Sequence, residues 1–110
     1  MSLKGSKKWD DPKTQELFQA MLKLRTVDEC QRFYRDLCTE EEIVDMADRF
    51  QVAKLLTRNM DYRDIADKLK ISTTTVGRVA KWLWRGMGGY QLVLSRLGLL
   101  HHTVQARGER

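Results

Sequence analysis

The chain has 110 residues, of which 42% are hydrophobic and 32% charged, so we expect one domain over residues 1–110 rather than a multidomain enzyme. No segment approaches the roughly 18–20 uninterrupted apolar residues of a membrane span, and the lysine-bearing start lacks the apolar stretch of a signal peptide. We therefore expect a cytoplasmic protein. A single proline and many helix-forming residues favour an all-α fold.

The formal charge of +5 is distributed unevenly along the chain. Residues 1–69 carry 13 basic and 14 acidic side chains, whereas residues 70–110 carry 7 basic and 1 acidic. A positive surface attracts a polyanion most strongly where carboxylates do not cancel it. This asymmetry favours a nucleic-acid-binding face in the second half, although a basic tail can also serve solubility alone.

The first ten residues are polar and have no helical period, so we expect residues 1–10 to form a loose arm. Asp11 can cap a helix that begins at Pro12, because proline lacks an amide that would stay unpaired there. The pattern predicts that this helix ends near Arg25. Its apolar side consists of Leu17, Phe18, Met21 and Leu22.

A capping box, in which Thr26 and Glu29 bind each other's backbone amides, predicts the start of a second helix. Its apolar stripe consists of Val27, Cys30, Phe33, Tyr34, Leu37 and Cys38. Since small disulfide-rich scaffolds normally carry four or more cysteines, we interpret the two cysteines as reduced thiols in the core.

A second capping box, Thr39 with Glu42, begins the longest predicted helix. Its apolar residues cover more than one face: Ile43, Val44, Met46, Ala47, Phe50, Val52, Ala53, Leu55 and Leu56. A chain of this length has few elements with which to cover them. We therefore predict that residues 11–57 are dimerisation helices covered in part by a second subunit.

Residues 61–85 match a helix-turn-helix, with Asp61 and Ser72 as the N-caps of its two helices. Ala66 is the small residue required where the helices cross. The apolar contacts are Ile65, Leu69, Ile71, Val76 and Val79. Lys70 stands where glycine is often found, so we expect a strained backbone or another kind of turn there.

The exposed residues of the second helix have the chemistry of DNA contacts. Hydroxyl groups can approach phosphates or base edges, and glycine permits close approach. Arginine can bind guanine through two hydrogen bonds, and lysine can neutralise a phosphate or contact a base edge. The predicted DNA-binding residues are Ser72, Thr73, Thr74, Thr75, Gly77, Arg78 and Lys81. The alternative is a solvated helix surface without a partner.

A last helix is predicted over residues 90–100, after a glycine-rich break, and residues 101–110 form a polar, basic tail. His101 and His102 are adjacent and would point to different sides of a helix, so we predict no metal site. No nucleophile–base pair, phosphate-binding glycine loop or zinc-protease pattern is present, and we expect no enzymatic activity.

The segment "ECQRFYRDLCTEEEIVDMADRFQVAKLL", followed by "YRDIADKLKISTTTVGRVAKWL", resembles the Trp repressor-like family, most closely its YerC/YecD branch. The resemblance covers about residues 14–97. It implies six helices per chain, a helix-turn-helix on each subunit, and an intertwined homodimer.

The resemblance also implies an effector site, because Trp repressors bind L-tryptophan between the long central helix and the recognition helix. Residues at the equivalent positions are Thr39, Arg49, Thr75 and Arg78. Val79 stands where the family has a glycine that makes room for the indole, so we expect that L-tryptophan is not the effector. We expect no cofactor, and the identity of any other effector stays open. Arg49 can alternatively pair with a carboxylate such as Asp45.

These observations predict a homodimeric, sequence-specific transcriptional regulator, a repressor, that binds double-stranded DNA through the major groove. Two alternatives remain open. The first is a protein-interaction adaptor that uses residues 26–48, with 8 acidic and 2 basic side chains, while the helix-turn-helix only packs. The second is sequence-independent binding of nucleic acid.

Overall fold

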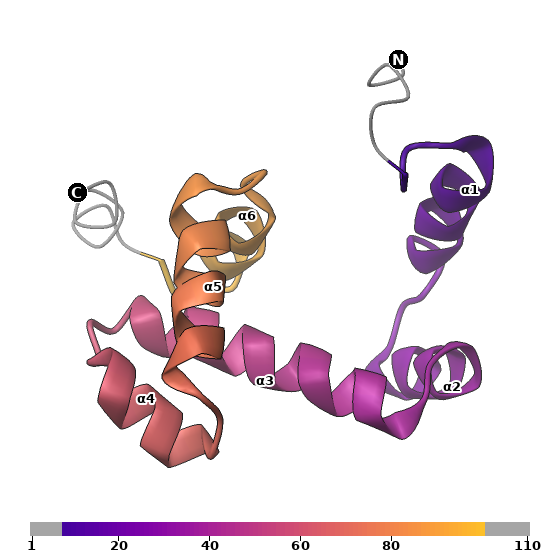
Figure 1. The fold of residues 1–110 in the computed structure, drawn as a ribbon. Helices are drawn as coiled ribbons and strands as arrows, with labels where there is room; N and C mark the ends of the chain where they lie inside the picture. The colour runs from indigo at the N-terminus through magenta and orange to yellow at the C-terminus, as the bar shows by residue number, and fades with distance from the viewer. Residues whose placement is uncertain (1–7, 101–110) are drawn as a thin grey trace. The chain divides into compact units, whose positions relative to one another are not determined.

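The computed structural model describes residues 8–100, which form six α-helices and no strand (Figure 1). The helices are α1 (Pro12–Met21), α2 (Val27–Leu37), α3 (Glu40–Leu56), α4 (Tyr62–Leu69), α5 (Thr73–Arg85) and α6 (Gly89–Arg96). The predicted all-α fold with six helices is confirmed. Most of the predicted arm, the predicted tail and the histidine pair lie outside the described residues.

The chain divides into two compact units, residues 1–40 and residues 41–110, and each is described by itself. The prediction of a single domain is not tested by this division and stays a prediction. Within residues 8–100, no helix is both long enough and apolar enough to cross a lipid bilayer.

Helix α1 begins as predicted, with the Asp11 carboxylate accepting a hydrogen bond of 2.9 Å from the amide of Thr14. This bond also lowers the pKa of the Asp11 carboxyl from its ordinary value. The helix ends at Met21, earlier than expected. The amide of Arg25 donates to the Glu29 carboxylate at 2.9 Å, which makes Arg25 part of the approach to α2.

The capping box of α2 is formed in one direction. The Thr26 hydroxyl accepts a hydrogen bond of 3.1 Å from the amide of Glu29, as predicted, whereas the Glu29 carboxylate binds the amide of Arg25 instead of Thr26. Neither α1 nor α2 has a buried residue, and both cysteines are free thiols of intermediate exposure. The apolar stripes therefore exist, but this unit does not cover them.

The second unit has a closed apolar core that joins the end of α3 to α4, α5 and α6. The core residues are Val52, Ala53, Leu55, Leu56, Ile65, Ala66, Val76, Val79, Ala80, Leu83 and Leu94. Helix α5 packs against both α4 and α6. It is therefore the element whose orientation the core determines most directly.

Helix α3 is covered only towards its end, since its buried residues all lie between Val52 and Leu56. In the earlier part Val44 is 56% exposed and Met46 is 40% exposed. The predicted excess of apolar surface is therefore real within the described chain.

Glycines and one side-chain hydrogen bond determine how α5 connects to α6 and where α6 ends. A Cβ atom on Gly86 would lie 2.4 Å from the carbonyl oxygen of Trp82, so the turn after α5 requires glycine. The Gln91 side-chain amide donates to the carbonyl of Leu83 at 2.7 Å and ties α6 to α5. Helix α6 ends at Arg96, before the predicted residue 100, because Gly98 adopts a φ of 75° that stops the helix.

Candidate nucleic-acid interface

The connection between α4 and α5 depends on a left-handed lysine. Lys70 has φ 59° and ψ 48°, the conformation in which glycine often ends a helix. The amide of Ile71 donates to the carbonyl of Ala66 at 3.1 Å and closes the turn. The strain expected at Lys70 from the sequence is confirmed, and the tight connection forms without glycine.

The start of α5 is held by Ser72. Its hydroxyl accepts a hydrogen bond of 3.0 Å from the amide of Thr75 and lies 3.0 Å from the Thr75 hydroxyl. Because this cap satisfies a helix-end amide, it offsets the poor helix propensity of three successive threonines. The hydroxyl groups of Ser72 and Thr75 thus bind each other, while Thr73 and Thr74 are exposed beside them.

One face of α5 is buried and the opposite face is exposed. Val76, Val79 and Leu83 are fully buried, and Ala66 of α4 lies in the same core. The exposed face carries Thr74, Arg78, Lys81 and Arg85, which follow one another at helical spacings of four, three and four residues. We call these four residues the basic ridge.

The charge of the basic ridge is not neutralised within residues 8–100. Arg78, Lys81 and Arg85 form no ion pair with a described residue, and α5 itself contains no acidic side chain. The sequence reasoning predicted Arg78 and Lys81 but missed Arg85, which lies one turn beyond Lys81 on the same face. The i, i+4 spacing was the signal that could have found it.

Gly77 is half-buried, and its bare side faces another residue of the helix-turn-helix. A Cβ atom added there would lie 3.9 Å from Cε2 of Tyr62, the first residue of α4. The space that Gly77 leaves open is therefore bordered by an aromatic ring. The sequence pattern did not predict this contact.

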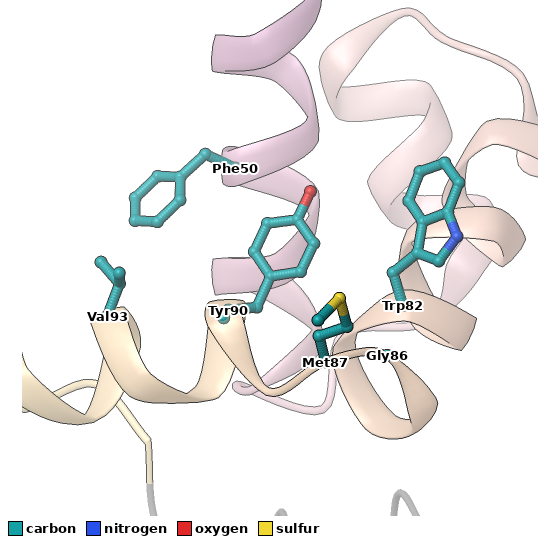
Figure 2. Close-up of a pocket in the computed structure, with 7 residues that line it drawn as sticks. Phe50, Trp82, Gly86, Met87, Tyr90 and Val93 are labelled. Carbon is teal, nitrogen blue, oxygen red and sulfur yellow. The ribbon is translucent and has the colours of Figure 1, made fainter. Parts of the chain in front are cut away.

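An apolar groove of about 570 Å³ is lined by residues of α3, α5 and α6 in the second unit. Figure 2 shows Phe50 of α3, Trp82 of α5, and Tyr90 and Val93 of α6 around it, with Met87 between the last two helices. Burial raises the pKa of the Tyr90 phenol, and the nearby positive charge of Arg49 opposes that rise. The lining has no carboxylate, histidine or thiol for acid–base or nucleophilic chemistry.

Residues 12–98 match the family model described as Trp repressor protein. The chain belongs to this family. It is 38% identical over 82 residues to the protein YerC of Bacillus subtilis (strain 168), covering 74% of this chain and 79% of that protein. The resemblance stated from the sequence motifs is confirmed.

Two crystal structures support the same assignment to the Trp repressor family. A TrpR like protein from Eubacterium eligens ATCC 27750 matches with a TM-score of 0.77 and 44% identity, covering 81% of this chain and 92% of that one. A structure from Staphylococcus aureus matches with a TM-score of 0.73 and 38% identity, covering 77% and 85% of the two chains. The Trp repressor-like fold of the chain is therefore established.

The residues predicted for a Trp repressor effector site are distributed over both units. Thr39 is exposed in the first unit, and Arg49 and Arg78 are exposed in the second. Arg49 forms no ion pair with Asp45, so that alternative is not seen. Val79 is fully buried in the core. The described residues contain no cluster of three or more metal-ligating side chains.

Proposed function

We propose that this chain is a sequence-specific DNA-binding transcriptional regulator, a repressor that acts as a homodimer. The observation that carries the proposal is the basic ridge of α5, which is exposed and unneutralised within the described chain while the opposite face of the helix is buried. A helix in this situation can enter the major groove without exposing the core. Membership of the Trp repressor family supports the same function.

In this proposal the start of α5 meets the base edges. Thr73 and Thr74 present short hydroxyl and methyl groups there, and Arg78, one turn beyond Thr74, is suited to guanine. Lys81 and Arg85 lie farther along the same face and neutralise phosphates. Ser72 acts mainly by holding the helix start, because its hydroxyl is already engaged with Thr75.

The homodimer is supported by apolar surface that a single chain leaves open. Helices α1 and α2 have no buried residue, Val44 and Met46 of α3 are exposed, and the groove at Tyr90 is lined by apolar side chains. A second copy of the chain would remove these surfaces from water. Two-fold symmetry then places two half-sites about 10–10.5 base pairs apart on the DNA.

The proposal includes no tryptophan effector. Val79 fills part of the core with a branched side chain and is fully buried, so the volume it occupies is not available to an indole ring. Titration calorimetry is expected to show no saturable binding of L-tryptophan. Saturable binding at micromolar concentration would contradict this part of the proposal.

DNA binding is tested by selecting bound fragments from a random duplex pool and measuring affinity for the selected site. Arg78→Ala is expected to cost about 1–3 kcal/mol and to relax selectivity at one base pair, because a base contact is lost. Lys81→Ala should weaken binding to all DNA sequences alike. It should also reduce the slope of log affinity against log salt concentration by about 1. The control is Arg32→Ala, which removes an exposed arginine of α2 that already pairs with Asp28 at 3.0 Å.

The alternatives give different outcomes in the same experiment. An adaptor that docks a basic partner through residues 26–48 would show little retention on heparin or DNA columns. A sequence-independent binder would be retained, but selection would yield no common site and Arg78→Ala would weaken all duplexes equally. Either result would overturn the proposed sequence-specific regulator.

A further inference from the structure

The first helix of the helix-turn-helix carries an exposed aromatic residue close to the basic ridge. Tyr62 begins α4 and is 45% exposed. Within residues 8–100 its hydroxyl has no hydrogen-bond partner. A tyrosine in this state has a half-covered ring and a polar end available for another molecule.

The ring of Tyr62 lies against the part of α5 that the proposed function assigns to DNA. Its Cε2 atom would be 3.9 Å from a Cβ at Gly77. Thr73 and Lys81 lie one turn before and one turn after Gly77, and both are exposed. The ring therefore lies beside the turn of α5 between two predicted DNA-contacting residues, and a Cβ at Gly77 would make an ordinary van der Waals contact with it.

We propose that Tyr62 is a further DNA-contacting residue, whose hydroxyl donates a hydrogen bond to a phosphate oxygen while its ring lies beside Gly77. This inference rests on the proposed DNA-binding function. In helix-turn-helix proteins the first helix crosses the sugar–phosphate backbone while the second enters the groove. Because Tyr62 lies on the first helix and borders the second, the backbone is the part of the duplex within its reach.

The charges around Tyr62 determine what kind of contact this is. Asp61 and Asp64 flank Tyr62 and Arg63 at the start of α4, and Asp61 makes no capping hydrogen bond through its side chain. Two carboxylates beside one guanidinium do not attract a phosphate by net charge. The contact is therefore a directional hydrogen bond from a neutral donor, and it releases no counterion when it forms.

The test compares the wild-type chain with Tyr62→Phe on the selected duplex, by fluorescence anisotropy at several salt concentrations. Phenylalanine keeps the ring beside Gly77 and removes only the hydroxyl. Affinity should fall about 2- to 10-fold, the range expected for one hydrogen bond, equally on all sequences and with an unchanged salt slope. The control is Ser95→Ala, which also removes one exposed hydroxyl, but on α6 outside the apolar groove, and it should leave affinity unchanged.

A second arm locates the acceptor on the DNA. In a series of duplexes, one phosphate at a time is replaced by an uncharged methylphosphonate. A methylphosphonate keeps one phosphoryl oxygen, so both diastereomers are used at each position. At the phosphate that Tyr62 contacts, the difference between wild type and Tyr62→Phe should disappear in the diastereomer whose methyl group replaces the accepting oxygen, whereas at other positions it should persist in both. Equal unfolding midpoints for the two proteins establish that the hydroxyl, and not the fold, accounts for the difference.

The outcomes separate this inference from the function on which it rests. If Tyr62→Phe binds like wild type while Arg78→Ala is weakened, Tyr62 is not a contact and the proposed function stands. A Tyr62→Phe defect confined to one base-pair position would overturn the assignment to the backbone. If the wild-type chain itself selects no duplex, the proposed function fails, and the role of Tyr62 fails with it.

Discussion

The two units of this chain differ in how far they bury their apolar side chains. In the second unit eleven hydrophobic residues form a closed core, and Leu83 is fully buried. In the first unit α1 and α2 have amphipathic stripes but no buried side chain, and Leu22 is 82% exposed. Both units contain well-capped helices, so local helix formation does not distinguish them.

The difference shows that local sequence signals and burial of apolar side chains are separate requirements for a stable helix. Capping bonds determine where a helix starts, but tertiary cover supplies most of the stability of a short helix. The helix-turn-helix obtains that cover from its own chain, whereas α1 and α2 would obtain it from a second copy under the proposed function. Mutations should therefore have different consequences in the two units.

The largest effect is expected from a charge placed on the apolar groove. Val93→Asp would put a carboxylate on the surface that the second copy is proposed to cover, and an unpaired buried charge costs about 3–5 kcal/mol. Sedimentation equilibrium should show a dimer for wild type and a monomer for the variant. Ser95→Asp is the control, because Ser95 is exposed on α6 and does not line the groove. A dimer in both variants would show that the groove is not the interface.

Shortening a core side chain should cost somewhat less free energy than the charge in the groove. This cost should not depend on protein concentration as a change at the dimer surface does. Leu83→Ala removes a fully buried side chain and should destabilise the chain by about 2–5 kcal/mol in denaturant unfolding. Phe18→Ala on α1 is the counterpart in the first unit, where the residue is exposed in the single chain. Its cost should appear as weaker dimerisation. If Phe18→Ala changes neither stability nor association, the apolar stripe of α1 has no partner.

One helix of each unit begins with a hydroxyl cap of similar geometry, so removing each cap compares the stability of the two units. Ser72 accepts from Thr75 at 3.0 Å in the second unit, and Thr26 accepts from Glu29 at 3.1 Å in the first. Ser72→Ala should lower the free energy of unfolding by about 1 kcal/mol, measured by chemical denaturation.

Thr26→Ala should have a similar effect only while the dimer holds α2 in place, so its effect should diminish on dilution. Asp61→Ala is the control, because Asp61 makes no side-chain capping bond and its loss should be nearly neutral. Equal costs for Ser72→Ala and Thr26→Ala at every concentration would mean that α2 is stabilised within its own chain.

Helix starts and exposed faces could be predicted from the sequence because they depend on neighbours a few residues away. The caps at Asp11, Thr26 and Ser72 are local bonds of this kind, and all three are present. The exposure of Arg78 and Lys81 followed from helical period alone. The early end of α1 was not predictable in this way, because the apolar period of Leu17, Phe18, Met21 and Leu22 continues past Met21 and no glycine or proline marks the end.

The contact between Tyr62 and Gly77 could not be predicted from periodicity, because it depends on how two helices cross. The small residue at Ala66 indicated that they cross closely, but not which side chains meet farther along. The lack of glycine at position 70 was likewise ambiguous. Only the structure shows that the turn is left-handed and that Lys70 adopts a positive φ there.

The smallest expected effect is a gain of stability at that same turn. Lys70→Gly should stabilise the second unit by about 0.5–1 kcal/mol, because the left-handed strain of a side chain outweighs the greater freedom of glycine in the unfolded chain. Asn59→Gly is the comparison, since Asn59 also has a positive φ of 62° but asparagine tolerates it better. Thermal unfolding should therefore show a clear increase for Lys70→Gly and little change for Asn59→Gly. Because the turn lies within the unit that closes its own core, the increase should persist when the dimer is diluted. A gain that vanished on dilution would mean that the helix-turn-helix also relies on the second copy, and the contrast between the units would fail.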